Sequence, residues 1–124
     1  MDRGLAILMT AAAGGLIALQ APINATLGRS TGSLPAALIS FGVGTIALAA
    51  IVILAGQAQG VGSLTDVSPV YLIGGLLGAV YVTCALIAVK SVGAGGVAAA
   101  TITGQLTASV VLDRMGAFLS LIHI

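Results

Sequence analysis

Charged side chains are absent from long stretches of this chain. Residues 30–65 contain no Asp, Glu, Lys or Arg, and such residues make up only 6% of the sequence. A soluble domain has about a quarter of its residues charged, which covers its surface. A charged residue at the centre of a membrane helix costs about 2.5–3.5 kcal/mol on insertion scales. The sequence therefore predicts an integral membrane protein that has the lipid bilayer as a partner.

Four apolar runs are separated by short polar or charged segments. They cover about residues 4–23, 34–56, 69–89 and 92–112. Each has about 20 residues, the number that a helix needs to cross a hydrocarbon core of about 30 Å. Strands of a membrane barrel alternate polar and apolar side chains, and these runs do not. The predicted fold class is an all-α, polytopic transmembrane helix bundle, with one domain over residues 1–118.

The Lys and Arg residues between the runs leave the orientation undecided. Arg3 and Arg114 fall on one side of the predicted bundle, and Arg29 and Lys90 fall on the other. Because the side richer in Lys and Arg normally stays in the cytoplasm, an even count permits both orientations and an antiparallel pair of chains. The alternative is that a partner or further residues break the tie. We expect a homo-oligomer or a pairing with a sibling subunit.

Small residues recur at intervals of about four within the predicted spans. In lipid little hydrophobic force draws helices together, and small residues let their backbones approach closely. We expect helix packing through one set of small residues: Gly44, Gly74, Gly78, Gly96, Ala100 and Gly104. We also expect three larger side chains of the third run to pack: Tyr81, Thr83 and Cys84.

Polar side chains without charge follow one face of the fourth run. Thr101, Gln105 and Ser109 recur every four residues, and Asp113 lies one turn further. Residues four apart share a face of a helix. This face lies beside the small residues of the same run. The pattern predicts a helix that packs on a neighbour and lines a cavity.

The first run ends with a proline between two amides. Gln20 and Asn24 are one turn apart, and Pro22 between them lacks the N–H that would bond a carbonyl one turn earlier. Transporters use interrupted backbone of this kind for binding. Two interpretations of the polar residues stay open, because such residues either line a substrate path or only hydrogen-bond neighbouring helices. For Asn24, Ser109 and Asp113 the second interpretation, a structural role, includes helix capping and anchoring at the membrane interface.

Other kinds of site lack the residues that they need. Asp2, Asp66 and Asp113 lie outside the runs or at their ends, whereas proton-coupled carriers usually hold an ionisable group within the bilayer. A single cysteine and a single histidine, Cys84 and His123, cannot form a metal site or a nucleophile–base pair. Four scattered Lys and Arg cannot form the basic stripe that binds nucleic acid. We therefore expect no enzyme, no metal, no cofactor and no nucleic-acid partner.

Four sequence blocks occur in order along the predicted spans: QAPINATLGR (20–29), ALISFGVGT (37–45), GGLLGAVYV (74–82) and GQLTASVVLDRMG (104–116). Together they resemble the first four spans of a known family, the small YdcZ-like proteins of the drug/metabolite transporter superfamily. The resemblance covers residues 4 to about 118. It implies a multi-pass transporter protein of the bacterial inner membrane, paired with itself or a sibling, without a settled substrate.

Members of this family normally have a fifth span, which the 124 residues do not supply. The segment 119–124 departs from the family pattern, and we interpret it as an atypical, artefactual tail at a truncated terminus. Our first hypothesis is a transporter subunit, in which two or more copies enclose a cavity for a small polar or amphiphilic solute. The alternatives are a membrane interaction subunit that transports nothing and an inactive fragment.

Overall fold

Helices account for the structure of the chain. The computed structural model describes residues 1–116, which contain no strand. The elements are α1 (Arg3–Thr31), α2 (Ser33–Leu54), the short 3₁₀ helices η1 (Ala58–Asp66) and η2 (Pro69–Leu72), and α3 (Ile73–Met115). The helices α1 and α2, and α3 together with η2, are each long and apolar enough to cross a membrane. The predicted all-α membrane bundle is therefore confirmed.

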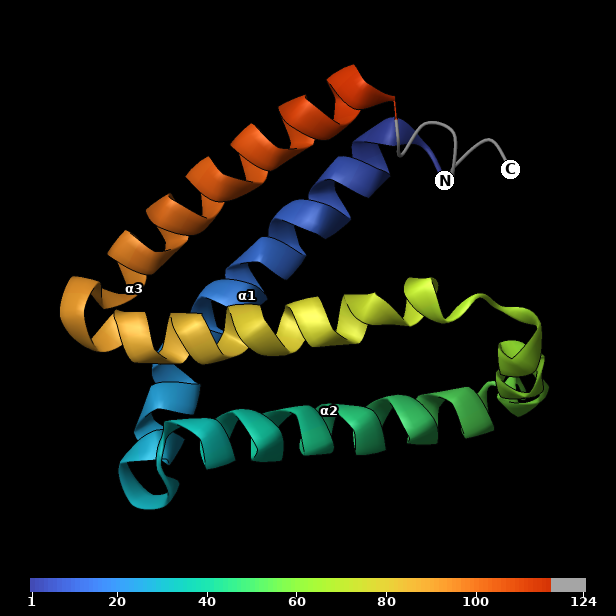
Figure 1. Cartoon of the computed structure of the whole chain (residues 1–124), viewed down its shortest axis with the longest axis horizontal. Helices are drawn as coiled ribbons and strands as arrows, with labels where there is room; N and C mark the ends of the chain where they lie inside the picture. Colours follow the sequence, from blue (N-terminus) through green and yellow to red (C-terminus); the bar gives the residue numbers. More distant parts are fainter. Residues whose placement is uncertain (117–124) are drawn as a thin grey trace.

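The longest helix, α3, reverses its direction near its middle. At Gly93 the backbone leaves the helical conformation, with a φ of 75° and a ψ of 171°. Only glycine adopts this conformation readily. Figure 1 shows the two halves, residues 73–92 and 94–115, diverging from this turn as the arms of a hairpin. Each half has about 20 residues, which is enough to cross the membrane, so α1, α2 and the two halves make four spans.

The turn in α3 lies inside the range predicted for the fourth span, 92–112. The prediction placed the boundary beside Lys90, because Lys90 carries the only charge in that part of the sequence. The helix continues past Lys90 to Gly93. The lysine side chain reaches Ser33 at the start of α2, where Nζ donates to the hydroxyl at 3.4 Å. The backbone freedom of glycine, rather than charge, therefore sets the end of the third span.

The first helix is longer than its apolar run, which predicted residues 4–23. It begins after Asp2, whose carboxylate accepts hydrogen bonds from the backbone N–H groups of Gly4 at 2.6 Å and Leu5 at 3.4 Å. It continues through Pro22 and ends at Gly32, where φ is 91°. Its 29 residues extend about 43 Å at about 1.5 Å per residue. Since this exceeds the hydrocarbon core, α1 is tilted or reaches beyond it.

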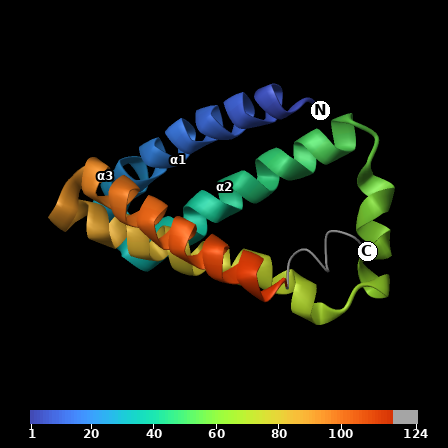
Figure 2. The ribbon, with the colours of Figure 1, turned by 90° about the horizontal axis from the view of Figure 1, so that it is seen from above.

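The buried core lies near the Gly32 and Gly93 turns, where α1, α2 and α3 meet. It is made mostly of alanines: Ala21, Ala25, Ala36, Ala37, Ala85, Leu86 and Val97. The start of α2 packs closely on α1 here, since a Cβ added at Gly28 would lie 3.6 Å from the Cβ of Ala36. Away from this end α1 and α2 diverge in the view of Figure 1, whereas they run in nearly the same direction in the view of Figure 2. Their large apolar side chains are exposed there, as suits contact with lipid.

Only one of the predicted packing glycines lies between two helices of this chain. A Cβ added at Gly78 would lie 3.4 Å from the ring of Phe41 in α2, and one at Gly96 would meet Val92, across the turn in its own helix. At three others an added Cβ would have no atom of the described residues within 4 Å beyond its own stretch of helix: Gly44, Gly74 and Gly104. Ala100 is exposed. For these residues, packing against another chain stays a prediction.

Candidate functional site

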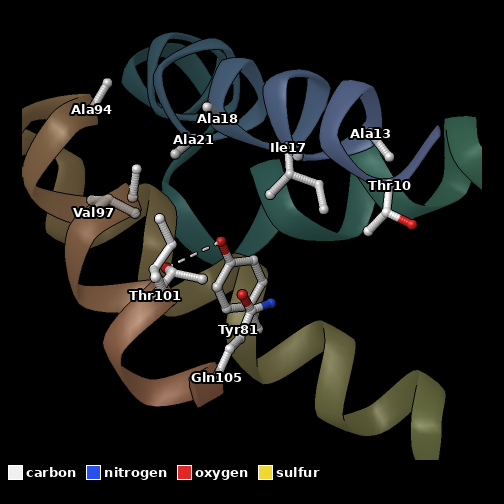
Figure 3. Close-up of a pocket in the computed structure, with 13 residues that line it drawn as sticks. Thr10, Ala13, Ile17, Ala18, Ala21, Tyr81, Ala94, Val97, Thr101 and Gln105 are labelled. Carbon is white, nitrogen blue, oxygen red and sulfur yellow. Dashed lines mark hydrogen bonds between the residues drawn. The ribbon is translucent and has the colours of Figure 1, made fainter. Parts of the chain in front are cut away.

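A groove lies between α1 and the second half of α3 (Figure 3). It has a volume of about 330 Å³, and we call it the α1–α3 groove. Its apolar walls include five alanines, and Ile17 is the largest apolar side chain that α1 contributes. Four polar side chains line it, and none of them carries a charge: Thr10, Tyr81, Thr101 and Gln105. The surface is therefore apolar with a few hydrogen-bonding groups.

A wider groove, of about 910 Å³, lies between the two halves of α3. It shares five lining residues with the α1–α3 groove: Ile17, Tyr81, Val97, Thr101 and Gln105. Cys84 lines only the wider groove. Because the two grooves share these side chains, they are neighbouring parts of one hollow region around α3.

The hydroxyl groups of Tyr81 and Thr101 connect the two halves of α3. Their oxygen atoms are 3.4 Å apart, and either group could be the donor. Figure 3 shows this pair, with the side chain of Gln105 beside Tyr81 and the residues of α1 above them. The usual distance for such a bond is about 2.7–2.8 Å, so this bond is long and weak. Both hydroxyl groups therefore remain able to bond a ligand.

A small cavity, of about 10 Å³, lies on the α1 side of Tyr81. Two of the predicted polar residues, Gln20 and Asn24, line it. Asn24 is only 5% exposed, and its Nδ2 atom has no hydrogen-bond partner among the described residues. Gln20 is exposed. The structure thus brings these two amides together, although at a cavity separate from the larger grooves.

The fourth-span residues divide into two pairs. Thr101 and Gln105 line both grooves. Ser109 is exposed, and its hydroxyl donates to the carbonyl of Leu106 at 3.0 Å. Asp113 is exposed near the end of α3 and lines neither groove. Ser109 instead lines a neighbouring hollow of about 480 Å³ together with Gln105. The polar face therefore lines hollows through its first three members, and a substrate role for any of them stays a prediction.

Comparison with known proteins gives one match. Residues 5–122 match the family described as "Putative inner membrane exporter, YdcZ". The chain belongs to the YdcZ family. The match includes all four spans and confirms the resemblance carried by the four sequence blocks. Searches of curated proteins and of solved structures gave no match.

The family match and the membrane-length helices together make this YdcZ-family chain a multi-pass inner-membrane protein. Its charges lie away from the grooves, at Asp2, Arg3, Arg29, Asp66, Lys90, Asp113 and Arg114. Over residues 1–116 no three metal-ligating side chains come together. Binding in the grooves would therefore rest on hydrogen bonds and apolar contact.

Most lining residues of this YdcZ-family chain were not predicted to line a cavity. Tyr81, which the sequence predicts as a packing residue, lines both grooves and the small cavity. Thr10 and Ile17 of α1 also line the α1–α3 groove. A signal for Tyr81 was available, because a tyrosine within a span carries a hydroxyl that needs a partner. Thr10 and Ile17 have no such signal, since apolar and hydroxyl side chains recur throughout the first span.

Proposed function

We propose that this YdcZ-family chain is a subunit of a membrane transporter that exports a small, uncharged, amphiphilic solute. In this proposal the solute binds in the α1–α3 groove, and the protein carries out no enzymatic reaction. The observation that supports it best is the lining of the groove, which is apolar apart from four uncharged polar side chains. The direction of transport follows the description of the family.

The chemistry of the lining favours a neutral solute. Moving an ion out of water costs several kcal/mol unless a partner charge compensates it, and this groove supplies none. A neutral amphiphile loses less hydration, and its apolar part gains contact with Ile17 and the alanines. The amide of Gln105 can donate and accept hydrogen bonds, as can the hydroxyl of Tyr81. A neutral solute with hydroxyl or carbonyl groups at one end and an apolar group at the other would therefore fit.

Alternating access needs a part of the protein that moves. The two halves of α3 are joined at Gly93 and linked by one long hydroxyl contact, Tyr81 to Thr101. Rocking of one half against the other would open and close the grooves, as helix bundles do in other transporters. The grooves are open-sided in a single chain, and in this proposal a second copy or a sibling covers them.

Transport by purified protein in liposomes tests the proposal. A matched pair of solutes, para-nitrophenyl glucoside and para-nitrophenyl glucuronide, differs only at C6 of the sugar, where the hydroxymethyl group of the first is a carboxylate in the second. We expect flux of the glucoside above that of protein-free liposomes, and no such flux of the glucuronide. Gln105→Leu should lower the glucoside flux about tenfold, the equivalent of about 1.4 kcal/mol for a lost hydrogen bond. Gln57→Leu is the matched control, because Gln57 is exposed in the loop before η1.

Three results would contradict the proposal in different ways. Equal flux of both solutes would contradict selection for neutral molecules. Normal transport by both Gln105→Leu and Gln20→Leu would show that the site is wrongly assigned. Flux of neither solute through correctly inserted protein would favour a membrane interaction subunit.

A further inference from the structure

We infer that Asn24, Gln20 and Tyr81 form a binding site for one hydrogen-bond acceptor oxygen. The oxygen belongs either to a single water molecule or to a hydroxyl or carbonyl group of a molecule that occupies the neighbouring groove. The inference goes beyond the proposed function, because such a site exists whether or not the chain transports a solute.

The side chain of Asn24 is the starting point. It is 5% exposed, and its Nδ2 atom is buried without a hydrogen-bond partner. A buried donor without a partner costs about 1–3 kcal/mol, and the large majority of buried polar side chains have one. Because the side chain is buried, bulk water does not supply one. A bound oxygen atom beside Asn24 would remove this cost.

The adjoining cavity has the size and the polar groups for such an oxygen. Its volume is about 10 Å³, close to the smallest that holds a water molecule. Buried waters usually make about three hydrogen bonds, and three polar side chains line this cavity: Gln20, Asn24 and Tyr81. The amide of Gln20 and the hydroxyl of Tyr81 can each donate or accept. An oxygen that accepts from Asn24 therefore finds two further partners.

The position of the cavity explains why a larger molecule could also supply the oxygen. Ile17, Ala21 and Tyr81 line both this cavity and the α1–α3 groove. A neutral molecule in the groove thus lies next to the cavity, and one hydroxyl or carbonyl group of it could enter. The rest of the cavity wall is apolar, from Val82 and Ala85, so only one polar atom is accommodated.

Nuclear magnetic resonance of the whole chain in lipid nanodiscs tests the inference directly. Asn24 is the only asparagine in the sequence, so isotope-labelled asparagine gives a single side-chain amide signal. We expect a cross-peak from its amide protons to a long-lived water. With benzyl alcohol added, a persisting water cross-peak identifies water as the source of the oxygen, and a cross-peak to the alcohol identifies a solute oxygen. Absence of a cross-peak in both samples would overturn the inference.

The thermal stability of Asn24→Leu in detergent gives a second test, because the Tm changes in opposite directions with and without a bound oxygen. Leucine has nearly the shape of asparagine without its polar atoms. If an oxygen is bound, the substitution removes its hydrogen bonds and lowers the Tm. If the amide is unpartnered, the substitution relieves a buried donor and raises the Tm, which would overturn the inference. Gln57→Leu in the exposed loop should leave the Tm unchanged. Neither readout involves transport, so failure here and failure of the proposed function are distinguishable.

Discussion

At the scale of single residues, the distance between helices depends on where a side chain is missing. The α2 helix approaches the first half of α3 at Gly78, where an added Cβ would lie 3.4 Å from the ring of Phe41. One turn earlier, a Cβ added at Gly74 would have no atom beyond its own stretch of helix within 4 Å. Both glycines belong to the same stripe of small residues, yet only Gly78 lies between two helices of one chain. They therefore form a matched pair for mutation.

We predict that Gly78→Leu destabilises the monomer and that Gly74→Leu does not. The leucine at position 78 must displace Phe41, and overpacking of this kind costs about 1–3 kcal/mol. Thermal unfolding of each variant in detergent, at a concentration where the chain is monomeric, measures the difference. Equal shifts of the Tm would contradict the packing described for α2 and α3. Loss of an oligomer in Gly74→Leu alone would support packing of Gly74 against another chain.

Residue spacing in the sequence predicts part of the candidate site. The interval of four residues places Thr101 and Gln105 on one face, because that interval follows from helix geometry, and both line the grooves. The same spacing includes Ser109, which lines a neighbouring hollow, and Asp113, which lines neither groove, since a repeat does not show how far a hollow extends along a helix. Tyr81 was not predicted to line a cavity, because its contact with Thr101 depends on the turn at Gly93.

At the scale of the helices, the hairpin of α3 depends on one backbone conformation. Gly93 has a φ of 75°, whereas Gly95 and Gly96 continue the helix. The apolar runs predicted two spans here, because hydropathy reports length and composition. They could not show which of three neighbouring glycines makes the turn, since all three have the same side chain and the choice depends on backbone angles alone.

We predict opposite effects of alanine at two of these glycines. Gly93→Ala forces a side chain into a conformation that costs about 1–3 kcal/mol, so the Tm in detergent should fall. Gly95 is helical, and a Cβ added there would have no atom beyond its own stretch of helix within 4 Å. Gly95→Ala should therefore raise the stability by about 0.5–1 kcal/mol. Thermal unfolding followed by circular dichroism measures both. A fall of similar size in the two variants would show that the turn does not depend on Gly93.

At the scale of the whole molecule, the two ends differ. The turns at Gly32 and Gly93 lie at the closed end with the buried alanines, and the N-terminus and the loop of η1 lie at the other (Figure 1). Arg29 and Lys90 belong to the closed end, because each lies three residues before one of its two glycine turns, and Arg3 and Arg114 lie at the far ends of α1 and α3. The even count of Lys and Arg therefore persists in the fold. A mixed orientation and pairing of chains stay predictions, because lipid and a second copy can cover exposed apolar side chains equally well.

The most direct test of a solute-binding hollow within the membrane uses the only cysteine of the sequence. Cys84 lines the wider groove, and its thiol reacts quickly only as a thiolate, which requires water. The measurement is the rate at which a water-soluble maleimide modifies Cys84 in liposomes. We predict modification in intact liposomes. Para-nitrophenyl glucoside should slow it, because a solute in the α1–α3 groove contacts Tyr81, Thr101 and Gln105, which also line the wider groove, and the glucuronide should have no effect. A thiol that stays unreactive until detergent is added, or that reacts at the same rate with and without the glucoside, would contradict this account.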